Sequence, residues 1–377
     1  IQPGATVDLA VAAAAPEASG PHTGTWQIFD GAGQPVPDPD GQTGTLSLSI
    51  QVIEPGNSLL PRLLYYISEE IGEAQLWRLE ADARTRTQIT HEAQPVVSFA
   101  ISSQGKIAYI SGNQLIAADR DGGAREVLLS LGEEGWRPGL AWSPDGTKLA
   151  YAFGGIQIRD FLSGLDRVLT TDSEGGPATR KVYEPYQWSP DGTKLLARVY
   201  LWEGAEMNIL SASDGAVLAH FPLEEAVWAA DNGSVAYAAH TAQGFLSSEP
   251  GLWQVSAGGG APQALIPGAN TWWPAAAPNN GVRFFMHPPE MSADPDYFVF
   301  PFELRDESTQ PEILNAPAVI LNPNDTFTIR WTKDAGGYVA YIVRPALDAG
   351  EVLFYEVDGS PPPLFLMQQI GQFEWGP

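Results

Sequence analysis

The chain has 377 residues, of which 44% are hydrophobic, enough to bury a substantial core and to form more than one domain. Its 45 acidic and 20 basic residues give a net charge of −25, which disfavours binding to nucleic-acid phosphates and to anionic membrane surfaces. Nucleic-acid binding is therefore not expected. The sequence contains no run of 18 apolar residues, the length needed to cross a bilayer, so membrane insertion is not expected either. The absence of cysteine excludes disulfides and thiolate chemistry.

The distribution of turn-forming residues predicts an all-β fold. The 32 prolines and 39 glycines separate short apolar runs that are rich in valine, isoleucine, tyrosine and tryptophan. Long stretches with helical periodicity are absent from the sequence.

Residues 1–55 predict a first, partial domain. Apolar residues alternate at Val7, Leu9 and Val11, a strand is expected over residues 25–29, and a last strand over 46–52. The PGATVD start and the HTGTWQIFD strand resemble the C-terminal half of the immunoglobulin-like four-tryptophan domain of autophagy receptors, which also occurs in bacterial surface proteins. This resemblance implies a partial Ig-like β-sandwich that lacks its first strands.

Three or four strands cannot close a two-sheet sandwich, because apolar faces would be left exposed. We therefore expect the missing Ig-like strands to come from an upstream segment or from another chain, the latter by β-augmentation. Residues 56–62 are predicted to be a linker, and residues 63–377 a second domain.

The second domain contains a repeat. Residues 63–90 predict three strands, and from Phe99 onward two strands around a glycine-bearing turn recur, with eight residues, WSPDGTKL, identical in two units. Successive units begin 40 to 55 residues apart, which is the period of four-stranded propeller blades. The marker positions before the turns are Ile101, Trp142, Trp188, Trp228, Ala276 and Trp331.

The end of the chain completes the ring in this interpretation. Residues 372–375, with Trp375 at the marker position, predict an innermost strand without its own hairpin, while residues 63–90 lack an innermost strand. We expect the C-terminal strand to close the β-propeller, because closure removes free sheet edges. Seven blades are preferred.

The repeated WSPDG motif is predicted to be structural. Proline fixes φ at the first corner, aspartate bonds its own backbone and glycine accepts positive φ, while the tryptophan fills the wedge between blades. The residues assigned to this role are Trp142, Asp145, Gly146, Trp188, Asp191, Gly192, Trp228, Trp331 and Trp375.

The WSPDGTKLAYA units resemble the propeller repeats of the TolB family and its secreted relatives, over residues 63–377. The family's propeller has six blades, so six is the alternative count. The resemblance implies an extracellular or cell-surface location, with the periplasm as the alternative.

No catalytic motif is present. None of the five histidines has a metal-ligand spacing, and there is no nucleophile elbow, HExxH motif or phosphate loop, so we predict neither enzyme activity nor a cofactor. Calcium is the alternative for the acidic turns at 37–41 and 292–297, but neither fits a twelve-residue calcium loop, and solvated turn acids are favoured.

A binding surface is predicted where the connections between blades meet the loops between second and third strands. Tryptophan, tyrosine and arginine dominate binding hot spots. The alternative is that some of these tryptophans plug the channel mouth or cover blade edges. The candidates are Trp136, Arg137, Arg180, Tyr183, Trp202, Trp272 and Trp273.

Three functions follow from this architecture. The first is a non-catalytic surface protein that binds a protein partner through propeller loops, and the second is a subunit that self-assembles through its incomplete Ig-like half. The third is a carbohydrate-binding or glycan-cleaving propeller, which would need two carboxylates about 5–10 Å apart.

Overall fold

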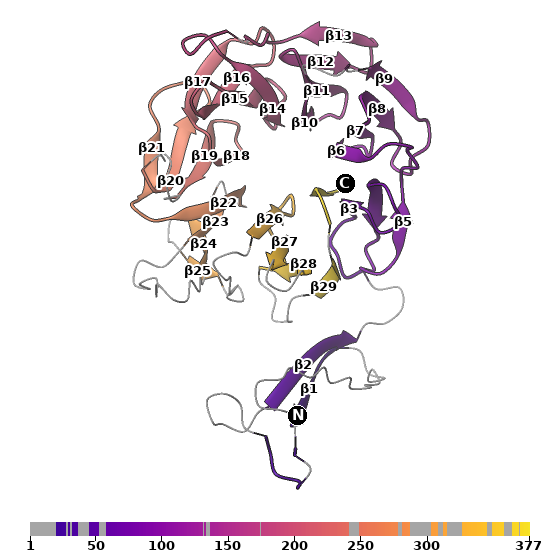
Figure 1. The fold of residues 1–377 in the computed structure, drawn as a ribbon. Coiled ribbons are helices and arrows are strands. Elements are labelled where there is room, and N and C mark those ends of the chain that lie inside the picture. The colour runs from indigo at the N-terminus through magenta and orange to yellow at the C-terminus, as the bar shows by residue number, and fades with distance from the viewer. Residues whose placement is uncertain are drawn as a thin grey trace. The chain divides into compact units, whose positions relative to one another are not determined.

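The structure of the chain is a computed structural model. All of its regular secondary structure in the described residues is β-strand (Figure 1). The structure describes residues 20–27, 29–30, 32–36, 45–52, 58–130, 132, 136–173, 175–240, 249–277, 281–286, 303–307, 312–314, 326–344, 349–357, 364–368 and 370–377. No helix among them is long and apolar enough to cross a membrane.

The chain divides into two compact units, one of residues 1–57 and 360–364 and the other of residues 58–359 and 365–377. In the first unit, β1 (Gly20–Gln27) pairs antiparallel with β2 (Thr45–Val52). The strand expected over 25–29 therefore begins earlier and ends at Gln27, whereas β2 agrees with its prediction. The alternating segment around Val7 lies outside the described residues, and the Ig-like sandwich stays a prediction.

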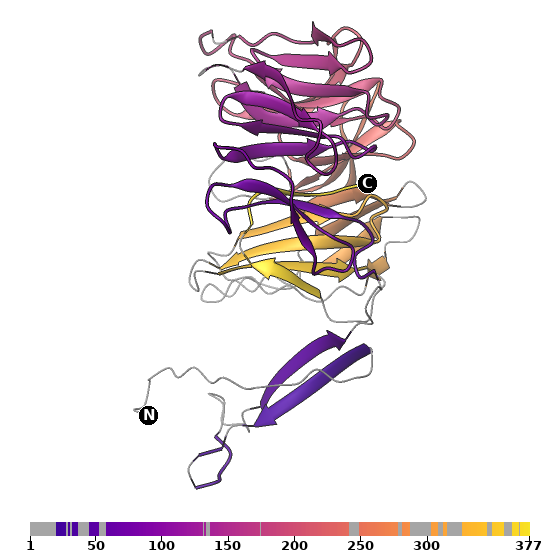
Figure 2. The ribbon, with the colours of Figure 1, turned by 90° about the vertical axis from the view of Figure 1, so that its right-hand side faces the viewer.

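The second unit is a β-propeller. Its described residues form seven four-stranded antiparallel sheets arranged in a ring, which Figure 2 shows from the side. In each sheet the first-named strand lies innermost. The strands are β6 (Val96–Ile101), β7 (Ile107–Ser111), β8 (Gln114–Ala118) and β9 (Glu126–Ser130); β10 (Trp136–Trp142), β11 (Lys148–Phe153), β12 (Ile156–Asp160) and β13 (Leu165–Val168); β14 (Val182–Trp188), β15 (Lys194–Tyr200), β16 (Ala205–Ser211) and β17 (Val217–Pro222); β18 (Glu225–Trp228), β19 (Ser234–Ala239), β20 (Gly251–Ser256) and β21 (Gln263–Pro267); β22 (Thr271–Ala276), β23 (Val282–Met286), β24 (Glu303–Glu307) and β25 (Glu312–Leu314); β26 (Thr326–Trp331), β27 (Gly337–Arg344), β28 (Ala349–Glu356) and β29 (Leu364–Gln368); and β30 (Phe373–Trp375), β3 (Leu64–Ser68), β4 (Gln75–Leu79) and β5 (Arg86–Gln88).

The ring closes as predicted. Strand β30 pairs antiparallel with β3, with Trp375 opposite Leu64 and Phe373 opposite Tyr66. Hydrogen bonds continue on both sides of this pairing, from Ile67 N to Gln372 O (2.9 Å) and from Gly376 N to Leu63 O (2.8 Å). The C-terminal strand thus covers an edge of β3 that would otherwise expose unpaired backbone groups.

The repeated turn has the predicted chemistry. The carboxylate of Asp145 accepts hydrogen bonds from Ser143 Oγ (2.6 Å) and from the amide of Thr147 (3.0 Å), and Gly146 has φ +69°. These interactions lock the hairpin between β10 and β11. The equivalent turn of the next blade repeats them through Asp191 and Gly192.

The marker tryptophans join neighbouring blades by hydrogen bonds as well as by packing. Trp188 is buried, and its Nε1 donates to the carbonyl oxygen of Ala141 on the innermost strand of the preceding blade, at 2.9 Å. This donation explains why tryptophan suits the position better than another large apolar residue. Four further pairs do the same: Trp142 with Ala100, Trp228 with Gln187, Trp331 with Trp273, and Trp375 with Arg330.

Apolar side chains fill the wedges between sheets. Between the blades of β14–β17 and β18–β21, for example, Phe221 stacks on Tyr237 with ring centroids 4.8 Å apart, beside the buried Trp228. Successive blades share clusters of this kind, so each sheet is stable only with its neighbours in place.

Candidate binding channel

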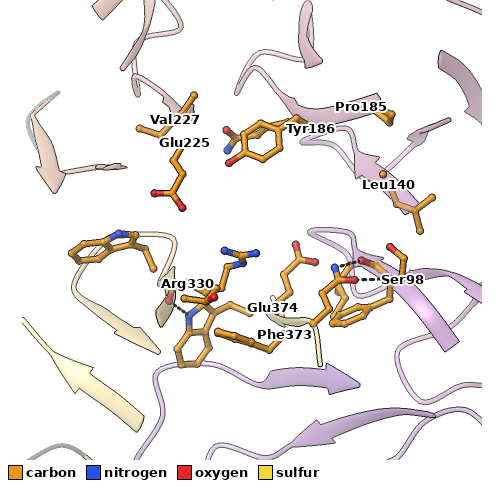
Figure 3. Close-up of a pocket in the computed structure, with 18 of the residues that line it drawn as sticks. Ser98, Leu140, Pro185, Tyr186, Glu225, Val227, Arg330, Phe373 and Glu374 are labelled. Carbon is orange, nitrogen blue, oxygen red and sulfur yellow. Dashed lines mark hydrogen bonds between the residues drawn. The ribbon is translucent and has the colours of Figure 1, made fainter. Parts of the chain in front are cut away.

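A cavity of about 1150 Å³ lies at the centre of the propeller and is lined by the innermost strands of all seven sheets. Its volume exceeds the roughly 300–1,000 Å³ that is usual for small-molecule pockets. Figure 3 shows side chains of several of these strands pointing into the same open space. We call this cavity the channel.

Bulges in the innermost strands shape the channel wall. The pairing of β14 with β15 shifts register between Pro185 and Gln187, and the pairing of β22 with β23 shifts at Trp273 and Pro274. Trp273 has φ +46°, a conformation that side-chain-bearing residues seldom adopt. A bulge re-aims the side chains next to it. Tyr186 and Trp273 line the channel as a result.

Two charged residues of the channel occupy a position at which the repeat diverges. The residue just before the marker is small and apolar in most blades, but it is charged in the last two innermost strands, β26 and β30. A comparison of this position across the repeats is the sequence signal that could have revealed the site. The residues there are Ala100, Ala141, Gln187, Val227, Ala275, Arg330 and Glu374.

Glu374 lies on the ring-closing strand β30 and is half-buried in the channel wall. Its carboxyl makes no hydrogen bond or ion pair to the residues that the structure describes. Burial raises the pKa of Glu374 to about 7, and the positive charge of Arg330 opposes this shift. The carboxyl is therefore partly protonated at neutral pH.

Glu225 begins β18 and points into the channel (Figure 3). Its Oε2 accepts a hydrogen bond from the backbone amide of Trp273, at 2.7 Å. Burial raises the pKa of Glu225 to about 7, although this hydrogen bond and the charge of Arg330 both favour the ionised form. Desolvation thus outweighs both stabilising contacts.

Arg330 lies between the two carboxyl groups in the view of Figure 3. Its Nη1 donates to the carbonyl oxygen of Ile329 at 3.0 Å, and its guanidinium lies 5.8 Å from the ring centroid of Phe373. The side chain is exposed to the channel and forms no salt bridge within the described part of the chain. A guanidinium in this state retains donors for a ligand.

Two further charged residues of the channel wall, Glu184 and Arg198, are paired with each other. One carboxylate oxygen of Glu184 forms an ion pair with Arg198 (3.1 Å), and the other accepts a hydrogen bond from the hydroxyl of Tyr200 (3.2 Å). The guanidinium of Arg198 also stacks over Tyr186, 4.6 Å from the ring centroid. This network holds the side chains of β14 and β15 in place rather than offering free groups.

The predicted hot-spot residues separate into different environments. Trp272 stacks on His240 (4.9 Å between centroids) and, with Trp273, packs against the core of the β26–β29 blade. Trp273 also lines the channel, so both tryptophans make contacts within the propeller.

The other candidates lie at the end of the propeller where the innermost strands begin. Trp202 follows β15 and is 52% exposed, whereas Tyr183, near the start of β14, packs against a core cluster. Arg137 and Arg180 are half-buried and have partners. The side chain of Trp136, at the start of β10, lies outside the described residues.

No group of three or more histidine, aspartate or glutamate side chains in the described ranges could hold a metal ion. Both acidic turns considered for calcium, 37–41 and 292–297, lie wholly outside those ranges.

The fold and the channel define a β-propeller with an open, charged centre. No protein-family model matches the chain. Similar solved structures include TolB from Acinetobacter baumannii (17% identity, 71% of each chain, TM-score 0.42), a putative TolB from Agrobacterium tumefaciens (12% identity, 82% of this chain and 89% of that one, TM-score 0.41) and oligogalacturonate lyase in complex with manganese (11% identity, 82% and 96%, TM-score 0.49).

Proposed function

We propose that this chain is a non-catalytic extracellular or cell-surface protein that binds a protein partner at the end of the channel where the innermost strands begin. We call this end the acidic mouth and define it by Trp202, Leu223, Glu224 and Glu225. The observation that supports the proposal is the exposure of Leu223, which lines the wide channel next to two carboxylates, and of Trp202, in the loop after β15 at the same end of the strands. Exposed aromatic and apolar groups next to a cavity are typical of protein-binding surfaces.

The charge of this surface indicates the kind of partner. The acidic mouth and the net charge of −25 favour association with a basic protein surface, mainly by raising the association rate. Trp202 can supply apolar contact area with little loss of side-chain entropy.

The two raised carboxyls favour binding over catalysis. A glycosidase separates the pKa values of its carboxyl pair, so that one acts as acid while the other is ionised. Here burial raises the pKa of both Glu225 and Glu374 to about 7. The positive charge of Arg330 opposes the effect of burial on the pKa of both groups. A shared upward shift does not give the division of roles that a glycosidase needs.

Display of random peptides against the immobilised protein would test the proposal. We expect enrichment of basic sequences that also contain apolar residues, and at least a tenfold loss of binding in Trp202→Ala. Leu162→Ala is the control, because Leu162 is 82% exposed but follows β12, in the turn to β13 at the opposite end of the strands. The proposal fails if no sequence is enriched, or if both variants bind equally.

A carbohydrate function is the second candidate, because Tyr186 and Trp273 line the same channel as the two carboxyls. A glycan array and a screen with chromogenic glycosides would detect it. Binding or turnover that Glu225→Gln abolishes would replace the protein-partner proposal.

Self-assembly is a further part of the proposal and concerns the first unit. Its described residues form a two-stranded sheet, and such a hairpin is marginally stable alone. We propose that an upstream segment or another chain supplies the further strands. Light scattering at several concentrations, with and without an upstream segment, would show a multimer that the segment suppresses if strands are exchanged between chains.

A further inference from the structure

The charges of the channel are ordered along its axis. The marker tryptophans set a common level, because Trp142, Trp188, Trp228 and Trp375 each bond to the residue just before the marker of the neighbouring innermost strand. The innermost strands therefore run in the same direction at the same height. Relative to this level, the height of any channel residue follows from its position in the strand.

The carboxylates stand toward the beginning of the strands. Glu225 is three residues before its marker Trp228, and Glu224 is one residue further out. At about 3.3 Å per residue, Glu225 lies roughly 10 Å before the marker level. Both residues line the channel at the acidic mouth.

The cations stand toward the other end. Arg330 immediately precedes its marker Trp331, and Lys333 lies in the turn beyond it. Arg62, which comes before β3, lines the same end of the channel. Lys333 and Arg62 are exposed and form no salt bridge with described residues. We call this end, defined by Arg62, Arg330 and Lys333, the basic mouth.

Such an arrangement discriminates between ligands by the order of their charges. The channel lining holds four acidic and four basic side chains, although the whole chain has 45 acidic and 20 basic residues. The Glu184–Arg198 pair is internally compensated, whereas Glu225, Arg62 and Lys333 form no salt bridge with described residues, although the charge of Arg330 acts on Glu225. Charges lining a cavity with low-dielectric walls produce a focused field, and a ligand with the opposite polarity relieves their desolvation.

We infer that the channel binds an extended segment of the protein partner that places a lysine or arginine at the acidic mouth and an aspartate or glutamate at the basic mouth. This inference rests on the proposed protein-binding function and specifies the chemistry of the bound segment. The large volume favours a polypeptide over a small molecule. Glu374, beside Arg330, limits the net positive charge at the centre, so a segment with one acidic group fits better than a polyanion.

Blocked hexapeptides can test this polarity directly. The probe has lysine at its second position and glutamate at its fifth, with glycine or serine elsewhere. Control peptides replace the lysine, the glutamate or both by glutamine. Isothermal titration at low salt is expected to show tightest binding for the probe, with about a fivefold loss for each replaced charge, as for a partly solvated ion pair.

Protein variants then assign each contact. Glu225→Gln should lower the affinity for the probe to that for the peptide without lysine. Lys333→Gln should lower the affinity for the probe to that for the peptide without glutamate. When a protein variant at one mouth is combined with a peptide that lacks the charge for the other mouth, the losses of binding free energy should add, since the two ends are separate. Gly176→Ala, in an exposed loop, serves as the control for unrelated changes.

Failure of this inference is distinguishable from failure of the proposed function. If none of the hexapeptides binds at millimolar concentration, or if Glu225→Gln and Lys333→Gln bind like the parent protein, the inference is overturned. A displayed peptide that still requires Trp202 would then leave the protein-binding function intact. If the peptide that lacks only the glutamate or the one that lacks only the lysine binds best, the channel is selective for one charge and its polarity has no role.

Discussion

The indole Nε1 of Trp375 donates a hydrogen bond to the carbonyl oxygen of Arg330 over 3.1 Å. The strand that closes the ring is thereby joined to the strand that supplies the channel's arginine. Glu374, next to Trp375, enters the channel through the same closure. Closure of the fold and completion of the charged site are therefore one structural event.

Loss of the apolar contact at the closing strand should destabilise the propeller. Phe373 is 3% exposed, and Phe373→Ala is expected to lower the free energy of unfolding by about 3–5 kcal/mol through the cavity it leaves. Denaturant titration measures the change. Phe365→Ala is the matched control, since Phe365 is 50% exposed, and a loss as large as that of Phe373→Ala would refute the assignment.

The hydrogen bond of a marker tryptophan can be separated from its packing. Trp188→Phe removes the donor to Ala141 but keeps most of the apolar contact, so we expect a loss of about 1–2 kcal/mol of stability, including the unpaired carbonyl. Trp188→Ala should cost about 3–5 kcal/mol, because the wedge between two blades is emptied. A Trp188→Phe variant as stable as the parent in thermal or chemical unfolding would show that the hydrogen bond contributes nothing.

The positive φ of the repeat turn predicts a selective glycine requirement. Gly146 has φ +69°, and an added Cβ would lie 3.2 Å from Cγ of Gln104. Gly146→Ala should reduce stability by about 1 kcal/mol or more, from backbone strain and crowding. Gly176→Ala, where no atom lies within 4 Å of an added Cβ, should change stability little. Unchanged unfolding midpoints in both variants would contradict this account of the turn.

The raised carboxyl pKa values predict a pH dependence of stability. Both Glu225 and Glu374 have a pKa of about 7 in the folded protein, above the ordinary value of 4.5, so the native state holds protons that the unfolded state has lost. Between pH 4.5 and 7 these two groups make stability fall as pH rises, and above pH 7 their penalty is complete.

Two variants test the sign of this effect. Glu374→Gln and Glu225→Gln should each be more stable than the parent near pH 8, on the order of 1 kcal/mol, and the advantage should shrink as pH falls to 5. Unfolding titrations at both pH values measure it. Other carboxyls contribute to both proteins alike, so the difference between variant and parent isolates the channel group. An advantage that grew toward pH 5 would contradict the assigned direction.

The architecture was accessible from the sequence because local rules determine it. Asp145 and Gly146 specify a tight hairpin through short-range hydrogen bonds and backbone dihedral angles. The spacing from Trp142 to Trp188 matches one blade, so the repeat predicts a propeller. Even closure by residues 373–375 could be predicted, since an innermost strand without a hairpin and a blade without an innermost strand complete one another.

The site depended on the tertiary structure. Glu225, Arg330 and Glu374 come from three different blades, and nothing local to any of them brings the three to one channel. Their pKa values depend on burial by neighbouring strands, which composition does not reveal. The position of Trp273 could not be predicted from the sequence either. Its local sequence is compatible with a surface hot spot or with a place in the channel wall, and only the bulge in β22 decides between them. The sequence by itself thus determined the ring, through short-range turn chemistry and a regular period. The tertiary structure alone decided which charges face one another, because that follows from long-range packing.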